Sequence, residues 1–363
     1  MLFGEKYDII RREDYIKKTE GAAMAKYEHK SRRRTPWEDA GEMSATQEFL
    51  KRNYKTYYAD RHRKLSESGE AAMINSYEPK KCRHCGSEKQ KRNGHTAGGI
   101  QRYKCGECGG TYLPTTGTIF DEHRISISEW TEYLLNIFRH VSLTAESWSN
   151  KNDYKTSRYW LQKVFMTLEG VQNGTVLSGD VYLDETFYAV RSDETVLKEN
   201  GTKLRGLSRN QTCIGVATDK RNTVLFVEGD GKPTQKKTAE TFRNHIKEGS
   251  TLHHDEDAAH KKLIAELSLK SKSYSSKELK KLPDKENPLN PVNRVHAVLK
   301  NFLDAHSGFL RSELQNWLNL FAFISNPPKD FLEKVDLFIS LAFQNPKSLR
   351  FRNFFGSSPD LDL

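Results

Sequence analysis

The stretch GDVYLDETFYAV, residues 179–190, sets the architecture expected for the second half of the chain. Apolar and polar residues alternate along it, which is typical of a β-strand whose successive side chains point to opposite faces of a sheet. Tyr182, Asp184 and Thr186 then share one face, and Glu185 points to the other. Only one of these two acids can line a site together with a neighbouring element, and we expect it to be Asp184.

Further strand and helix patterns follow this stretch. Strands first and then alternation with helices predict a mixed α/β domain over residues 174–345, in which apolar helices near the C-terminal end cover the sheet. The region between residues 270 and 289 is interpreted as a basic, proline-containing connection. The remaining segments are QTCIGVATD (211–219), NTVLFVEGD (222–230) and STLHHDE (250–256) as strands, and TAETFRNHIKEG (238–249) and AAHKKLIAELSL (258–269) as helices.

A second carboxylate, Asp255, ends the strand STLHHDE just before a helix. Two carboxylates at strand ends suit Mg²⁺, which binds through one or two carboxylates and the phosphate oxygens of a substrate. The chain carries no serine or cysteine nucleophile motif. Asp184 and Asp255 are therefore the candidate ligands of a divalent metal.

The segment NPVNRVHAVLK, residues 290–300, has the pattern of the first turns of a helix, and we expect Asn290 to cap it. Lys300 lies about 20° short of two full turns from Asn293 and roughly 10 Å further along the axis, so the two share a face. An amide oxygen is a suitable Mg²⁺ ligand, and the lysine is placed to hold a phosphate. His296 borders the same face and either contacts DNA or packs.

Two other acids compete with Asn293 for the role of third ligand. Glu286 lies in the proline-flanked loop LPDKENP, which would hold it poorly. Asp304 is only about 20° from the stripe of Asn293 but roughly 16 Å further along the helix axis. The distance disfavours Asp304, and the loop disfavours Glu286.

Four of the five cysteines, Cys82, Cys85, Cys105 and Cys108, form two C-x2-C pairs separated by nineteen residues. Two such pairs supply the four thiolates of a structural, tetrahedral Zn²⁺ site, which leaves no position open for catalysis. We therefore predict a zinc ribbon over residues 80–117, with His84 and His95 as bystanders. Cys213, in the apolar run TCIGVA, is expected to be a buried core thiol.

The ribbon is strongly basic. Between Lys80 and Tyr112 the chain has eight Lys and Arg residues against two Glu, out of an overall net charge of +10 and a pI near 9.1. This concentration of charge indicates a phosphate-binding surface and favours a polyanionic partner. The candidate DNA contacts are Lys89, Lys91, Arg92, Arg102 and Lys104.

Residues 118–172 are expected to be a helical domain. The motif SISE (126–129) has the form of a capping box before a helix over residues 127–139, and a short and a longer helix follow. Three helices with a short middle member favour a helix-turn-helix, in which Arg158 and Lys163 of the last helix would contact DNA. A plain helical linker domain is the alternative, because no glycine marks the turn.

The two ends of the chain give less information. Residues 1–79 form an extension with charges of both signs, including SRRR (31–34) and a helix pattern over 47–65, and residues 346–363 form a tail. The charged start MLFGEKYDIIRRED does not fit a secretory signal, and no run of about 18 apolar residues occurs. We expect a cytoplasmic protein.

With these motifs in order, the sequence resembles one family. VYLDETF, LHHDEDAAH and NPVNRVHAVLKNFLDAHSGF behind a C-x2-C ribbon are similar to DDE-type transposases of bacterial insertion sequences, specifically the zinc-ribbon-bearing insertion-sequence 1595 family. The resemblance covers about residues 80–328. It implies a ribonuclease-H-like catalytic domain in which Asp184, Asp255 and Asn293 bind two Mg²⁺ or Mn²⁺ ions. The family's third position is Glu, Asn or His followed seven residues later by Lys, which matches Asn293 and Lys300.

The resemblance also implies double-stranded DNA as partner and a bacterial protein associated with the nucleoid. The implied reaction is hydrolysis at the transposon ends followed by attack of the freed 3′-hydroxyl on target DNA, carried out by a homo-oligomer on paired ends. Two alternatives are a non-catalytic DNA-binding regulator derived from a transposase and a zinc-ribbon nuclease that cuts without joining. Because Asn293 is neutral, two carboxylates give the metal ligands a charge of −2 instead of −3. Metal occupancy is therefore expected to depend on bound DNA.

Overall fold

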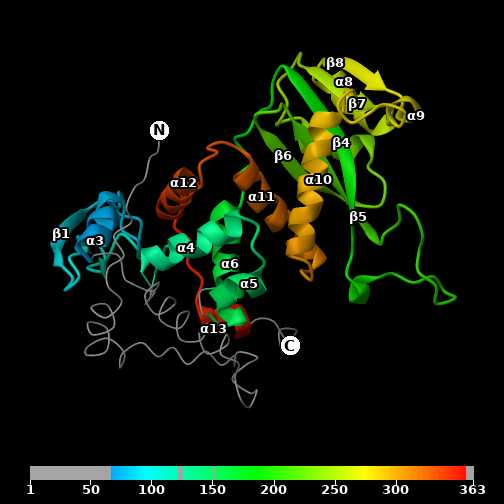
Figure 1. Ribbon diagram of the computed structural model, residues 1–363. Helices are drawn as coiled ribbons and strands as arrows, with labels where there is room; N and C mark the ends of the chain where they lie inside the picture. The colour runs from blue at the N-terminus through cyan, green and yellow to red at the C-terminus, as the bar shows by residue number, and fades with distance from the viewer. Residues whose placement is uncertain (1–66, 122–125, 150–151, 357–363) are drawn as a thin grey trace, which may run out of the picture.

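The computed structural model describes residues 67–121, 126–149 and 152–356, which form a small sheet, a helical middle part and a larger sheet covered by helices (Figure 1). SRRR (31–34), the helix pattern over 47–65 and residues 357–363 of the tail lie outside the described residues. None of the described helices combines the length and apolar character that crossing a membrane requires.

The larger sheet has five strands in the order β6-β5-β4-β7-β8. The first three strands along the chain pair antiparallel, whereas β7 runs parallel to β4 and β8 parallel to β7. This confirms the expected mixed α/β architecture. The strands are β4 (Asp180–Ala189), β5 (Gln211–Thr218), β6 (Thr223–Asp230), β7 (Thr251–Asp255) and β8 (Lys270–Tyr274).

Strand β8 was not predicted, since its sequence KSKSY was interpreted as part of a connection. Four of its five residues are exposed, because β8 is an edge strand of the sheet. Lysines on an edge strand discourage pairing with another chain. Because they replace apolar residues, the alternation by which a strand is recognised in a sequence is absent from β8.

Helices cover both faces of this sheet. On one face α7 (Gln235–Phe242) and α8 (Lys261–Glu266) pack against alternate residues of β4 such as Val181 and Leu183. On the other face α10 (Asn290–Ala305) and α11 (Leu314–Ser325) pack against Tyr182 and its neighbours. The remaining short helices of this part are η1 (Ser192–Glu194), η2 (Ala258–His260), α9 (Ser276–Leu279) and η3 (Arg311–Glu313).

Helix α10 begins one residue earlier than expected. Asn290 is its first helical residue rather than its cap, and Leu289 holds the cap position without a capping side chain. Asn287 takes over part of that role, because its side-chain oxygen accepts the Leu289 N–H at 2.8 Å. The cap prediction for Asn290 was therefore wrong, but Asn293 still lies in the first turn.

The middle part consists of α4 (Ile127–Phe138), α5 (Leu143–Ser149) and α6 (Tyr154–Leu168), with the C-terminal α12 (Phe331–Gln344) and α13 (Phe351–Gly356) beside them (Figure 1). Ser126 caps α4 as expected, accepting the Glu129 N–H. Three successive helices with a short middle member are present.

The last of these helices does not offer Lys163 to a ligand. The side chain of Lys163 is 1% exposed, and its ammonium group donates to the Ile119 carbonyl at 2.7 Å. Its predicted contact with DNA is therefore wrong, because the group satisfies a carbonyl inside the core. Arg158, on the same helix, is partly exposed and lies 3.7 Å from the carboxylate of Glu313.

The small sheet at the N-terminal side has strands β1 (Gln90–His95), β2 (Gln101–Cys105) and β3 (Thr111–Tyr112), all antiparallel. Helix α3 (Glu67–Ser76) precedes it, and Asn75 accepts the N–H of Gln101 at 2.8 Å. Tyr77 stacks on Phe343 of α12 at 4.3 Å between ring centroids. The end of the predicted 1–79 extension thus packs on both the ribbon and the helical part.

The tight contact between β5 and α7 gives a test of the packing of the larger sheet. A Cβ on Gly215 would lie 2.7 Å from the ring of Phe242 and 2.9 Å from a carboxylate oxygen of Glu228. Gly215→Ala is expected to lower the free energy of unfolding by about 1–3 kcal/mol, measured by denaturant titration. Gly174→Ala, where a Cβ meets no atom within 4 Å, is the matched control. Equal stability of the two variants would contradict this packing.

Candidate metal centres and nucleic-acid interface

The first candidate site lies where β4 and β7 run side by side. These parallel strands pair Tyr182 with His253, and Asp184 and Asp255 each lie two residues further on. Equal steps along paired strands keep side chains at one level and on one face, so the two carboxylates are neighbours. Burial, together with the charges of Glu185 and Asp255, raises the pKa of Asp184 to about 7.

Helix α10 covers this face of the sheet. His296 is 9% exposed, and its Nδ1 lies 3.9 Å from Oδ2 of Asp184. Burial lowers the pKa of His296 to about 4, and the charge of Lys300 acts in the same direction. The imidazole therefore favours its neutral form and packs beside Asp184 with little exposed surface, in keeping with the packing alternative for His296.

Asn293 lies one turn before His296 on α10 and is half-buried. Among the described residues, no group forms a hydrogen bond with its side chain, and its backbone N–H bonds to Leu289. Lys300 lies one turn after His296 and is exposed. The helix thus carries an uncommitted amide, a neutral imidazole and an exposed ammonium group along the side that passes Asp184.

The two rivals of Asn293 lie elsewhere. Burial raises the pKa of Tyr188, and the charge of Asp304 raises it further, which places Asp304 beside a residue four positions beyond Asp184 on β4. Glu286 is exposed in the turn before α10.

Beneath Asp184, on the opposite face of the sheet, Glu185 meets a buried histidine. Oε1 of Glu185 lies 3.0 Å from Nε2 of His260, which is fully buried. Nδ1 of His260 lies 3.2 Å from Nδ1 of His254 and 3.8 Å from Oδ1 of Asp255. His254, Asp255 and His260 offer atoms within 4.8 Å of one another. Since the two imidazoles are already engaged with each other and with Glu185, we interpret them as a hydrogen-bonded group that packs beside the Asp255 side chain.

The sequence analysis placed Glu185 on this opposite face correctly but gave it no partner, and it did not identify His260. The signal available was the pattern HHDEDAAH itself, with histidines on both sides of Asp255. A histidine in a helix is usually a core or surface residue, so the pattern alone does not give the contact.

A further acid, Glu228, lies in the same layer. It is 4% exposed and accepts the hydroxyl of Thr238 at 3.2 Å, with the thiol of Cys213 at 3.9 Å. Burial, together with the charge of Glu185, raises the pKa of Glu228 to about 7. Cys213 is 1% exposed, so it is a buried core thiol.

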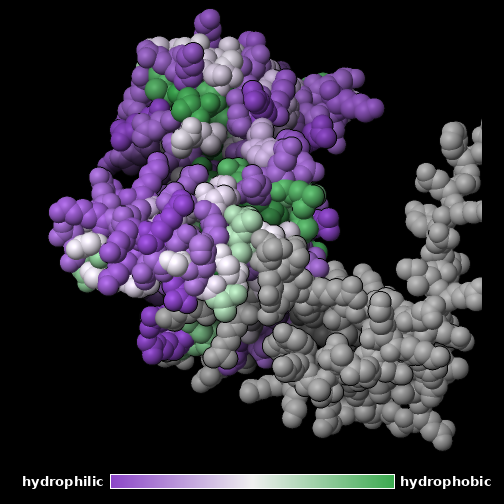
Figure 2. All heavy atoms as spheres, turned by 90° about the vertical axis from the view of Figure 1, so that its left-hand side faces the viewer, coloured by the Kyte–Doolittle hydropathy of each residue, from purple (hydrophilic) through white to green (hydrophobic). Residues whose placement is uncertain are grey.

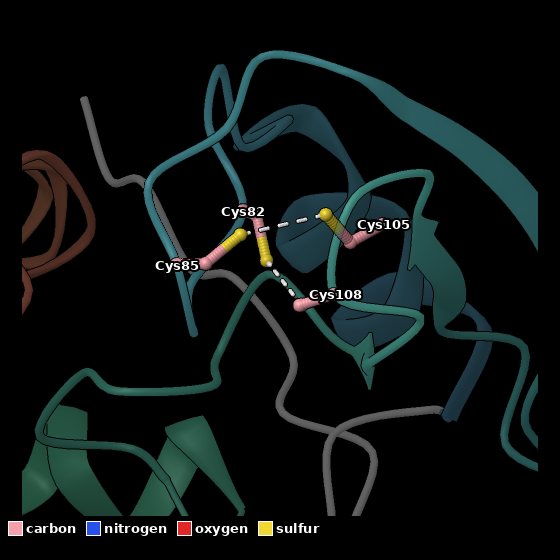
Figure 3. Close-up of side chains that lie close together, drawn as sticks. All are labelled: Cys82, Cys85, Cys105 and Cys108. Carbon is pink, nitrogen blue, oxygen red and sulfur yellow. Dashed lines mark hydrogen bonds between the residues drawn. The ribbon is translucent and has the colours of Figure 1, made fainter.

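The four paired cysteines converge on one point (Figure 3). Sγ of Cys82 lies 3.8 Å from Sγ of Cys108, and Sγ of Cys85 lies 3.6 Å from Sγ of Cys105. A tetrahedral site with Zn–S bonds of about 2.3 Å requires sulfur–sulfur distances of about 3.8 Å, so the cluster fits zinc. Backbone N–H groups of Cys108 and Glu107 point at Cys105 and lower the pKa of its thiol to about 6.

The ribbon carries its basic residues in two groups. Lys91 and Lys104 are directly opposite each other on β1 and β2, and Arg102 lies on the same exposed face. Among the described residues, no carboxylate lies within 4 Å of these three side chains. Lys89 and Arg92, by contrast, are paired with Glu107 and Glu78. The face of the molecule that carries the ribbon is dominated by hydrophilic residues (Figure 2).

With this geometry in place, comparison with known proteins identifies the larger sheet. Residues 176–326 match the family model described as the ISXO2-like transposase domain. The transposase resemblance expected from the sequence is thereby confirmed. No curated protein matches the chain significantly.

Three solved structures are similar to part of the chain. One is the simian T-cell lymphotropic virus intasome in complex with PP2A regulatory subunit B56 gamma, at 12% identity and a TM-score of 0.28, covering 53% of this chain and 65% of that chain. The Mos1 transposase paired-end complex with left transposon end has 9% identity and a TM-score of 0.29, covering 61% and 79%. The Drosophila P element transposase strand transfer complex has 12% identity and a TM-score of 0.24, covering 62% and 66%. The chain thus spans less than two thirds of the intasome chain, and TM-scores this low carry no argument about function.

The cysteine cluster predicts the zinc content of the purified protein. Cys85→Ser removes one of four thiolates and is expected to reduce bound zinc from one equivalent to well below it, measured by elemental mass spectrometry. Cys213→Ala changes a thiol outside the cluster and is expected to keep one equivalent. Full zinc in Cys85→Ser would contradict the four-thiolate site.

Glu228 predicts a pH-dependent stability difference. Its pKa is raised from 4.5 to about 7, so the fold disfavours its ionised form. The resulting cost is absent at pH values below about 4.5, grows as the pH rises and is complete above about 7. Glu228→Gln removes the charge and is expected to stabilise the transposase domain by about 3 kcal/mol near pH 8 and by much less near pH 5.

Denaturant unfolding of both proteins across this pH range measures the effect. Glu240→Gln, at an exposed glutamate of α7, is the control and should show no such trend. A gain that is the same at both pH values would contradict the raised pKa.

Proposed function

We propose that the protein is a DNA transposase that cuts the phosphodiester at transposon ends and joins the freed 3′-hydroxyl to target DNA. The observation that carries the proposal is the pair Asp184 and Asp255 on adjacent parallel strands, covered by the helix of Asn293, inside a transposase-family domain. The strand order, three antiparallel strands followed by two parallel ones, supports a ribonuclease-H-like catalytic domain.

Asp184, Asp255 and Asn293 are proposed to hold two Mg²⁺ or Mn²⁺ ions. Their oxygens fit hard divalent cations, and the raised pKa of Asp184 indicates that the site lacks positive charge. When bound, two such ions activate the attacking oxygen and stabilise the leaving oxygen of an in-line displacement. His296 stays neutral beside Asp184, so it orients the carboxylate without offsetting its charge.

The remaining positive charge is supplied from the surface. Lys300 is exposed two turns from Asn293 on α10, where it is proposed to hold a phosphate of the DNA next to the carboxylates. The neutral amide of Asn293 leaves the ligand set at −2. DNA phosphates would complete it, so metal binding and end binding are proposed to strengthen each other.

The zinc ribbon, residues 80–117, is proposed to bind the DNA backbone through Lys91, Arg102 and Lys104. Like charges directly opposite each other in a sheet are destabilising unless an anion lies between them, which supports a phosphate at this face. Lys89 and Arg92 would join by exchanging their carboxylate partners. We further propose the helical region 118–172 as the second DNA-binding part, residues 174–345 as the catalytic domain, and a homo-oligomer on paired ends.

The central assignment can be tested with a labelled, pre-cut transposon end whose sequence is taken from the DNA flanking the coding region. Asn293→Ala is expected to lower strand transfer by about 10–100-fold, because one metal ligand is lost. Glu286→Ala, in the exposed turn before α10, is the matched control and should retain activity.

The reverse result, activity in Asn293→Ala and none in Glu286→Ala, would contradict the ligand assignment. If the wild-type protein cuts an uncut transposon end but does not join the pre-cut end to target DNA, the result would favour a nuclease. Binding to ends with neither reaction would favour a DNA-binding regulator.

A further inference from the structure

His260 is the most deeply buried polar side chain beside the proposed metal ligands. It ends the short helix η2, whose first turn is fixed by Asp257, which accepts the N–H of Ala259 at 2.9 Å. The residue has no exposed surface. Its two ring nitrogens therefore face protein groups in a position that the backbone determines.

The imidazole connects the two faces of the sheet. Nε2 contacts Glu185 on the α7/α8 face, and Nδ1 contacts Asp255, whose side chain belongs to the α10 face, around the end of β7. Next to it, His254 is held by the hydroxyl of Ser271 on β8 at 2.9 Å. A continuous set of polar contacts thus runs from β8 through β7 to β4, underneath Asp184 and Asp255.

The two oxygens of the Asp255 carboxylate have different surroundings. Oδ1 accepts the N–H of Asp257 at 3.0 Å and lies 3.8 Å from His260. Among the described residues, no group forms a hydrogen bond with Oδ2. One oxygen is therefore engaged by the protein, which fixes the plane of the carboxylate, and the other is left for a ligand.

We propose that His260 is a positioning residue, which packs beside Oδ1 of Asp255 and, together with the N–H of Asp257 that Oδ1 accepts, fixes the carboxylate so that Oδ2 is left for the divalent metal of the transposase site. The inference rests on the proposed function, since it assumes that Asp255 is a metal ligand. Partners that orient a metal ligand from behind commonly change metal affinity by about 10–100-fold when removed. The role of Glu185 is then to fix the far side of the same imidazole.

Two substitutions separate the two ends of the ring. His260→Gln places an amide nitrogen at the position of Nε2, so it keeps the contact with Glu185 and loses the one with Asp255. His260→Asn places a nitrogen at the position of Nδ1, so it keeps the contact near Asp255 and leaves Glu185 buried without a partner. His260→Gln is therefore expected to lower metal affinity more than stability, and His260→Asn is expected to lower stability more than metal affinity.

The measurement is the Kd for Mn²⁺ of the full-length, zinc-loaded protein without DNA, together with the unfolding temperature in buffer free of Mn²⁺ and Mg²⁺. His260→Gln is expected to weaken Mn²⁺ binding by about 10–100-fold with an unfolding temperature close to wild type. His260→Asn is expected to bind Mn²⁺ more tightly than His260→Gln and to unfold at a lower temperature. His306→Gln, at a buried histidine at the far end of α10, controls for replacing an imidazole by an amide and should bind Mn²⁺ like wild type.

Wild-type Mn²⁺ affinity in His260→Gln would overturn the inference. So would a parallel loss of affinity and stability in His260→Gln, because that would indicate a role in folding alone. If His260→Asn does not fold, the comparison of His260→Gln with His306→Gln decides. Asp255→Asn separates a failure of the proposed function from a failure of the positioning role. If Asp255→Asn binds Mn²⁺ like wild type, Asp255 is not a metal ligand and the proposed function itself fails. If Asp255→Asn loses Mn²⁺ but His260→Gln binds it like wild type, only the positioning role is lost.

Discussion

Two carboxylates of like charge, Asp184 and Asp255, lie side by side on parallel strands, and much of the domain is arranged to keep them there. The parallel pairing of β4 with β7 requires a crossover, which α7 provides. Burial and the neighbouring acids raise the pKa of Asp184 to about 7, so the site destabilises the ionised form of this carboxylate. A site of this kind gains free energy from a bound cation, and this constraint links the fold to the proposed metal chemistry.

The residues on the two faces of the sheet contribute differently to the surroundings of Asp184 and Asp255. On one face α10 brings the imidazole of His296 to within 3.9 Å of the Asp184 carboxylate and leaves Lys300 exposed. On the other face Glu185 and His260 fill the space beneath the strands with polar contacts, and Gly215 makes room for Glu228 and Phe242. The face that carries Asp184 and Asp255 can therefore stay open to a ligand, because the residues that support these carboxylates are buried on the opposite face of the sheet.

Much of this could be predicted from the sequence, and the failures have physical reasons. Strand alternation placed Asp184 and Glu185 on opposite faces, and the C-x2-C spacing predicted the cysteine cluster, because both are local patterns. Strand β8 was missed because an edge strand replaces apolar residues with lysines. Lys163 was assigned to DNA because its charge is visible in the sequence, whereas the carbonyl that it satisfies lies far away along the chain. The contact between Glu185 and His260 depends likewise on tertiary structure.

The most direct test of the central claim is anomalous diffraction from crystals of the protein soaked in Mn²⁺ with a bound DNA end. The account predicts Mn²⁺ between Asp184 and Asp255, within ligand distance of the side chain of Asn293, and its loss in Asp184→Asn. Mn²⁺ bound instead by the imidazoles of His254 and His260, with Asp184 and Asn293 unliganded, would contradict it.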